Sequence, residues 1–194
     1  MKTLLVTGGT GGLGTQVVER LSKDYRCVLL TRDDLRNVKA AIEKAGSFYG
    51  VIHLVGGFEL GAVSETTSET WSKMIESNLT VAFNVIREAL GKIERPGRIV
   101  TISSITSIEK PKGIAAYVVS KSALNTLIEV TAREVAGTGI TANALLPDTL
   151  DTPASRQALP KARRVPLDRV ADSIAFLLSD TAANINGALI PLRA

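Results

Sequence analysis

The stretch TGGTGGLG, residues 7–14, stands between a short apolar run and a longer amphipathic pattern. The run TLLVT (3–7) predicts a buried strand, and GLGTQVVERLSKD (12–24) predicts a helix. Glycines between them let the backbone turn tightly and come close to a ligand, while the helix N-terminus offers free N–H groups to phosphate. The stretch therefore predicts a pyrophosphate cradle. Its candidate contacts are Gly8, Thr10, Gly12, Leu13 and Gly14.

The same alternation of short β-branched runs and helical patterns continues along the chain. RCVLLT (26–31) completes a βαβ unit, and four further strands are expected over 51–55, 98–103, 140–147 and 188–192. Helices are expected between them over 35–45, 71–90, 115–136 and 168–179, the first of these capped by Asp33 or Asp34. Strands separated by helices predict an α/β fold with a doubly wound parallel sheet of Rossmann type. Ligands of such sheets bind at the carboxyl ends of the strands.

Composition limits the classes of protein that the chain can belong to. A length of 194 residues with 45% hydrophobic content suits one domain, 1–194, with a sizeable core. The formal net charge is +4 and the 23 Lys and Arg are spread along the chain, so no nucleic acid partner is expected. No metal site is predicted either, and the lone Cys27, among apolar neighbours, indicates a buried structural thiol and a reducing compartment.

The apolar run in the N-terminal segment MKTLLVTGG is too short for the apolar core of a secretion signal. No later stretch approaches the ~18 apolar residues of a membrane helix. We therefore expect a soluble cytoplasmic protein without a membrane partner.

The end of the second predicted strand bears on the choice of cofactor. An acidic residue there would bind the adenosine ribose, whereas an arginine favours a 2′-phosphate. Thr31 and Arg32 occupy this place, so NADP(H) is the favoured cofactor. Asp33 and Asp34 follow at once and keep NAD(H) open as the alternative.

Tyr117 and Lys121 are spaced to lie one turn apart on the same face of a helix. An ammonium beside a phenol favours the ionised phenol, which makes Tyr117 a candidate acid and base. A hydroxyl from the end of RIVTISS (98–104) is expected to hydrogen-bond the substrate oxygen across the site. These groups suit carbonyl–alcohol chemistry, with hydride supplied by a nicotinamide cofactor.

These motifs together resemble the short-chain dehydrogenase/reductase family over nearly the whole chain. Ser104 lies thirteen residues before Tyr117, which is the spacing of the active serine in that family. The resemblance implies that Tyr117 is the general acid in reduction, that Lys121 binds the nicotinamide ribose and lowers the tyrosine pKa, and that Ser104 orients the carbonyl. Asn78 is similar to the helix asparagine that supports a proton relay through the lysine.

The resemblance also extends to the nicotinamide end of the cofactor site. Pro147 begins LPDTLDTP, where the family has a Pro-Gly segment whose backbone and threonine hold the nicotinamide. The implied cofactor contacts are Gly56, Pro147, Leu150 and Thr152, besides Arg32, Tyr117 and Lys121.

The chain also departs from the family pattern. The family's Asn-Asn-Ala-Gly is replaced by His53-Leu54-Val55-Gly56, which removes two bracing amides and makes His53 a sheet-end packing residue rather than a catalyst. Asp148 stands in place of a glycine and puts a carboxylate near the cofactor's approach. The segment after the second strand has no room for the usual extra helix and strand. We therefore expect a sheet shortened by one edge strand.

Alternatives for the activity stay open. LVGGF (54–58) and residues 146–160 resemble quinonoid dihydropteridine reductases, although those enzymes generally lack the active serine. The shortened sheet and altered segment would also suit a non-catalytic NADP(H) sensor or interaction module. Residues 153–166 are expected to form a mobile substrate lid. Within this lid, the basic residues Lys161, Arg163 and Arg164 are expected to be a solvated cluster, with attraction of an anionic substrate tail as the alternative.

Two of the predicted helices are apolar on more than one face. One face must pack on the sheet, and the second is expected to pack on a partner subunit, which predicts a homodimer or homotetramer. The residues concerned are Val81, Phe83, Val85, Ile86 and Leu90 in one helix, and Leu124, Leu127, Ile128 and Val130 in the other.

Overall fold

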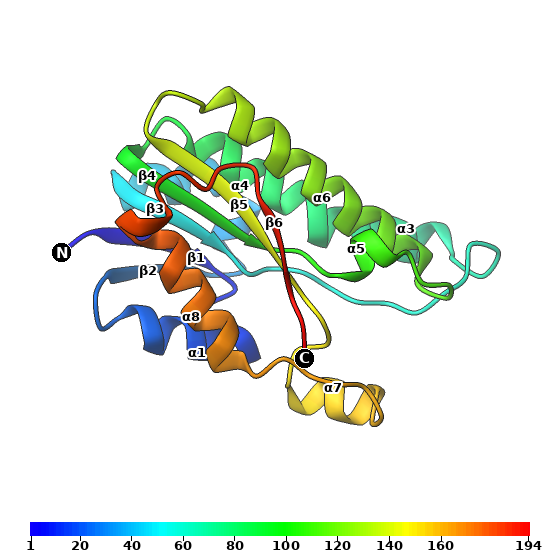
Figure 1. The fold of residues 1–194 in the computed structure, drawn as a ribbon. Coiled ribbons are helices and arrows are strands. Elements are labelled where there is room, and N and C mark those ends of the chain that lie inside the picture. The colour runs from blue at the N-terminus through cyan, green and yellow to red at the C-terminus, as the bar shows by residue number, and fades with distance from the viewer.

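The computed structural model describes all 194 residues, and a six-stranded parallel sheet forms its centre (Figure 1). The strands are β1 (Thr3–Thr7), β2 (Arg26–Leu30), β3 (Phe48–His53), β4 (Ile93–Ile102), β5 (Ile140–Pro147) and β6 (Leu189–Leu192). The α-helices are α1 (Gly12–Leu21), α2 (Val38–Ala45), α3 (Ser68–Ile75), α4 (Val81–Ala89), α5 (Thr106–Glu109), α6 (Ala115–Glu134), α7 (Pro153–Ala158) and α8 (Leu167–Leu178). Short turns η1 (Asp34–Arg36) and η3 (Asp180–Ala182) are 3-10 helices, and η2 (Glu76–Thr80) is a π-helix.

The strands are ordered β2-β1-β3-β4-β5-β6, and every neighbouring pair is parallel. The common Rossmann order places a further strand outside the second one. Here the connection from β2 to β3 holds only η1 and α2, so β2 is the edge of the sheet. The expected Rossmann-type fold and its missing edge strand are both confirmed.

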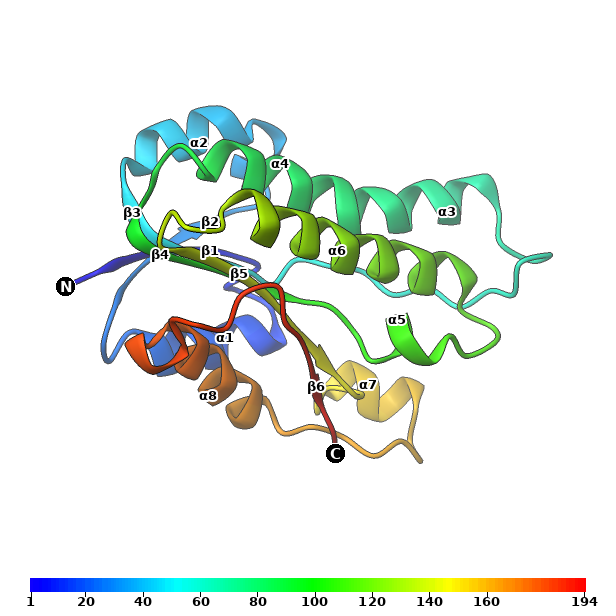
Figure 2. The ribbon, with the colours of Figure 1, turned by 45° about the horizontal axis from the view of Figure 1, so that its top comes forward.

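The helices cover both faces of the sheet (Figure 2). Because side chains alternate along a strand, one set faces α2, α4 and α6 and the other faces α1 and α8. Leu5, Val51 and Ile99 belong to the first layer, where they share a buried cluster with Leu124 and other residues of α4 and α6. The position of a residue in this alternation therefore determines which layer of helices its side chain contacts.

Several boundaries differ from those predicted. Strand β3 starts at Phe48 rather than residue 51, and β4 starts at Ile93 rather than residue 98. The cap of α2 is Asn37, whose side chain accepts a hydrogen bond from the Ala40 amide at 3.3 Å, and neither Asp33 nor Asp34. The Asp34 carboxylate instead accepts hydrogen bonds from the Thr31 amide and hydroxyl, each at 2.7 Å.

The helix predicted over residues 71–90 contains a π-helical turn. It begins earlier, at Ser68, and the π-helix η2 separates α3 from α4. The extra residue in a π-helical turn rotates the following side chains, and such turns often occur at functional sites. Asn78 lies inside this turn and is completely buried.

The two helices predicted to be apolar on more than one face each have buried and exposed apolar residues. Val85 of α4 and Leu124 and Ile128 of α6 are buried, whereas Phe83 and Val130 are each more than two-fifths exposed. Assembly through the exposed residues stays a prediction. No helix of the protein has the length and apolar character needed to cross a membrane.

Close backbone approach defines the turn after β1. Gly8 has a φ of 71°, and a Cβ on Gly14 would lie 2.0 Å from the Gly8 carbonyl oxygen. Because the obstacle is backbone rather than a movable side-chain end, only glycine lets α1 pack this close to the strand end.

Replacing Gly14→Ala should therefore destabilise the fold. We expect a loss of about 1–3 kcal/mol, the usual range for overpacking, and a melting temperature several degrees lower. The matched control is Gly91→Ala, because a Cβ at Gly91 meets nothing within 4 Å. Equal melting temperatures for the two variants in calorimetry would contradict this account of the turn.

Candidate active site

Helix α6 is fastened to the carboxyl end of β4 by polar contacts around Lys121. Its ammonium Nζ donates to the Ile102 carbonyl at 2.8 Å, and the Ser103 hydroxyl donates to the Lys121 carbonyl at 3.3 Å. Lys121 is only 4% exposed, and burial lowers the pKa of its ammonium to about 8. These contacts bring the motif of α6 to the edge of the sheet where parallel strands end.

Ser104 and Tyr117 face each other from the two sides of this junction. Burial raises the pKa of the Tyr117 phenol, and the nearby Ser104 hydroxyl partly opposes that rise. The Ser104 hydroxyl is also held by Thr106, with 2.9 Å between the two side-chain oxygens. The structure thus joins the predicted serine and tyrosine, which lie on different elements.

The electrostatic relation between Tyr117 and Lys121 differs from the one predicted. The Lys121 ammonium is bound to a main-chain carbonyl, and the phenol pKa is raised by burial rather than lowered by the lysine. A phenol with a raised pKa stays protonated at neutral pH, so in this state it is a proton donor.

Asn78 connects three parts of the site. Its amide oxygen accepts from the Gly57 amide at 2.9 Å, and its Nδ2 donates to the Gly57 carbonyl at 3.1 Å and to the Ser120 hydroxyl at 3.1 Å. The Ser120 hydroxyl in turn donates to the Tyr117 carbonyl at 2.8 Å. Asn78 therefore braces the loop after β3 in a chain that lacks the family's two bracing amides.

Gly56 packs against the Asn78 side chain. A Cβ at Gly56 would lie 2.7 Å from Asn78 Oδ1 and 3.1 Å from Lys121 Nζ, so the asparagine and the lysine approach the same point of the loop.

His53 is completely buried at the end of β3. The Thr7 hydroxyl lies 2.9 Å from its Nδ1, and Nε2 has no hydrogen-bond partner. Burial, assisted by the positive charge of Lys121, lowers the pKa of His53 to about 3. The imidazole is therefore neutral at physiological pH, which agrees with a packing role and not with that of a general acid.

The glycine turn and the segment after β5 form the other side of the site. Helix α1 has no side-chain N-cap and no acid in its first turn, so nothing from the chain competes with an anion there. Thr152, reached through Pro147 and Leu150, caps α7 and lies next to this turn: its Cγ2 would be 3.5 Å from a Cβ on Gly12. The two predicted cofactor segments therefore adjoin in space.

At the outer end of this surface, Arg32 is exposed and takes part in none of the ion pairs of the protein. The two acids that follow it are already engaged, Asp33 with Arg36 at 3.4 Å and Asp34 with Thr31. The guanidinium of Arg32 is thus the free group at the end of β2.

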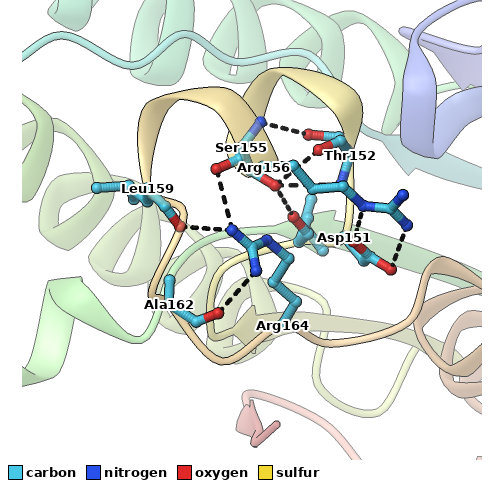
Figure 3. Close-up of polar contacts among 8 residues, drawn as sticks. Asp151, Thr152, Ser155, Arg156, Leu159, Ala162 and Arg164 are labelled. Carbon is cyan, nitrogen blue, oxygen red and sulfur yellow. Dashed lines mark hydrogen bonds and ion pairs between the residues drawn. The ribbon is translucent and has the colours of Figure 1, made fainter.

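The segment predicted as a lid contains the helix α7, and hydrogen bonds and an ion pair hold it together (Figure 3). Arg164 donates to the carbonyls of Ala162, Ser155 and Leu159, and Arg156 makes a two-bond ion pair with Asp151 at 2.7 and 2.8 Å. The prediction that Arg164 belongs to a solvated basic cluster is therefore wrong, because its guanidinium donates hydrogen bonds to backbone carbonyls of the lid.

The Asp148 carboxylate is engaged within the protein. Its carboxylate accepts hydrogen bonds from Arg193 at 3.2 Å and from the Ala194 amide at 3.0 Å. Asp148 therefore anchors the C-terminal residues to the end of β5.

Sequence reasoning missed Phe58. Its ring meets that of Tyr117 edge to face, with centroids 5.0 Å apart and planes at 77°, and 45% of Phe58 is exposed. The contact joins a loop to a helix far along the chain, so no local pattern signals it.

A parallel sheet with a glycine turn after β1 and a serine–tyrosine–lysine set at the strand ends indicates the class of nicotinamide-dependent dehydrogenases and reductases. Comparison with known families agrees, since the family model described as enoyl-(acyl carrier protein) reductase matches residues 25–192. The chain belongs to the short-chain dehydrogenase/reductase family, whose members are NAD(P)-dependent oxidoreductases acting on CH–OH and C=O groups.

Characterised relatives include two 3-oxoacyl-[acyl-carrier-protein] reductases named FabG. The one from Rickettsia felis is 30% identical, with 97% of this chain and 94% of the relative covered. The one from Escherichia coli K12 is 27% identical, with 96% and 93% covered. Among solved structures, BdcA in complex with NADPH is 25% identical and has a TM-score of 0.87, with 99% of this chain and 93% of that chain covered. The expected family and oxidoreductase class are confirmed. These relatives do not bear on the local resemblance to dihydropteridine reductases.

Proposed function

We propose that the protein is an NADP(H)-dependent reductase that converts a small ketone into a secondary alcohol, with residues 1–194 acting as one cofactor-binding and catalytic domain. The observation that carries the proposal is the meeting of Ser104 and Tyr117 beside the buried Lys121. A sensor that only binds cofactor has no need of this proton-transfer set.

The residues of the glycine turn fit the pyrophosphate of the cofactor, because the N-terminus of α1 has free amide donors and Gly14 lets α1 pack closely against the turn. Arg32 would pair with a 2′-phosphate, and Thr152, Pro147, Leu150 and Gly56 would lie along the nicotinamide half. The bound cofactor supplies the hydride. The relative BdcA was solved with NADPH, which supports the choice of NADP(H) over NAD(H).

The chain's own groups would handle the proton. The Ser104 hydroxyl donates a hydrogen bond to the substrate carbonyl oxygen, and the Tyr117 phenol gives that oxygen its proton as negative charge develops on it. A phenol pKa raised by burial keeps this proton in place until the oxygen becomes basic. Lys121 would hold the nicotinamide ribose, while Asn78 keeps the loop at Gly57 in place.

The surroundings of Tyr117 favour a substrate with an apolar or flat group next to its carbonyl. Phe58 covers one side of the phenol and leaves much of its own ring exposed. The FabG relatives are 3-oxoacyl reductases, so β-ketoacyl thioesters belong in the first assays together with aryl ketones, quinones and quinonoid dihydropterin.

The first test is Tyr117→Phe, assayed by loss of nicotinamide absorbance with NADPH and this panel of carbonyls. We expect turnover to fall about 10²–10⁴-fold, the usual contribution of a general acid, with NADPH binding retained. Tyr25→Phe is the control, because the Tyr25 hydroxyl only contacts the Leu178 carbonyl at 3.5 Å. NADPH binding by the wild type without turnover of any carbonyl would favour the sensor.

Arg32→Ala tests the choice of cofactor. Losing one charge-assisted contact to the 2′-phosphate should raise the Kd for NADPH about tenfold and leave the Kd for NADH unchanged. Arg36→Ala serves as the control, since Arg36 pairs with Asp33. Isothermal titration gives both constants, and equal losses for the two cofactors would count against a 2′-phosphate contact.

Phe58→Ala tests whether the Phe58 ring contacts the apolar or flat group of the substrate. Loss of an aromatic contact should lower kcat/KM for aryl ketones by about three- to tenfold and leave small aliphatic ketones nearly unaffected. Phe83→Ala, which removes a similarly exposed ring from α4, is the matched control. A uniform loss across both classes of ketone would show that Phe58 only supports Tyr117.

A further inference from the structure

Three buried polar side chains form a row across the centre of the sheet. Thr7, His53 and Thr101 are register partners on β1, β3 and β4, and all three have no exposed surface. They continue the alternation of Leu5, Val51 and Ile99, so they face the layer of α4 and α6. This is the layer from which Lys121 and Asn78 enter the site.

Two atoms of this row have no hydrogen-bond partner within the protein. They are His53 Nε2 and Thr101 Oγ1, on adjacent strands at the same register. Buried polar atoms are costly unless they are paired, and polar clusters of this kind are the usual sites of buried water. Both atoms therefore require a partner that the surrounding side chains do not supply directly.

The Lys121 ammonium approaches the same strand end as this row. It is bound to the carbonyl of Ile102, the residue after Thr101, and its charge acts on His53. An ammonium has three N–H donors, and one of them is used by Ile102. The groups that flank His53 in the row, Thr7 and Thr101, are uncharged.

We propose that His53 is a positioning residue for Lys121, acting through one buried water that accepts from the ammonium and donates to His53 Nε2 and Thr101 Oγ1. In this arrangement Nδ1–H donates to the Thr7 hydroxyl, which leaves Nε2 as the acceptor. The His53 pKa of about 3 keeps the ring neutral, so it attracts the ammonium through the water instead of repelling it.

The consequence for the reaction rests on the proposed role of Lys121. A hydrogen-bond acceptor beneath the ammonium favours its charged form and opposes the lowering caused by burial. His53 would thus help to keep the Lys121 ammonium charged in its buried place.

The test measures the titration of Lys121 directly, by NMR of lysine labelled with ¹³C at Cε, with the signal assigned from Lys121→Met. In His53→Leu we expect the Lys121 pKa to fall by about one unit, a tenfold change in its protonation equilibrium. Thr101→Val should lower it in the same direction, and His53→Asn, which keeps a polar side chain in the row, should recover at least half of the change. The ¹⁵N shifts of His53 should report a neutral ring with the proton on Nδ1.

Thr141→Val is the matched control, because Thr141 Oγ1 is also buried and unpartnered but is registered with Arg98, away from the site. A Lys121 pKa in His53→Leu that equals the wild-type value, or that moves equally in Thr141→Val, would overturn the proposal.

The titration needs no turnover, so it separates this inference from the proposed function. If the carbonyl panel is inactive but the Lys121 pKa moves as expected, only the proposed reductase activity fails. Where turnover is found, its pH profile should shift in His53→Leu by the same amount as the Lys121 pKa, whereas a lower melting temperature alone would mean that His53 only packs.

Discussion

The hydrogen bond from the buried Lys121 ammonium to the Ile102 carbonyl determines where the polar groups of this protein meet. A charge in a buried place needs hydrogen-bond acceptors close by, and the carboxyl end of a central strand provides one. Holding this end of α6 against β4 brings Tyr117 to Ser104, and Ser120 to Asn78. The loop at Gly57 is then held by Asn78, and the rest of the candidate site follows from that placement.

The missing edge strand has consequences on the cofactor side. With β2 at the edge, Leu29 is 37% exposed, and the adenine end of the site has no further strand beside it. The Arg32 guanidinium lies at this end without an ion-pair partner, since the two acids that follow it are engaged by Arg36 and Thr31. An exposed charge can attract a phosphate without the support of an additional strand, so a shortened sheet is compatible with a phosphorylated cofactor.

How much could be predicted differed from element to element. The six strands and the glycine turn follow from local patterns, since each depends on apolar runs and on backbone geometry that neighbouring residues dictate. The start of β4 at Ile93 could not be predicted in this way, because this polar and proline-containing stretch joins the sheet only through long-range pairing, of Ile93 with Phe48 and of Gly97 with Ile140. The role of Arg164 was mistaken for a similar reason: its carbonyl partners become available only when the segment after α7 folds back.

The sequence by itself determined the parallel α/β architecture and the absence of the edge strand, and it predicted Ser104, Tyr117 and Lys121 as site residues, because these depend on spacing along the chain. Only the tertiary structure decided the phenol's raised pKa, the bracing of Gly57 by Asn78 and the row of Thr7, His53 and Thr101. Each of the latter depends on desolvation or on contacts between strands and helices distant in sequence. Burial and register are properties of the packed sheet, so they do not exist until the strands have paired.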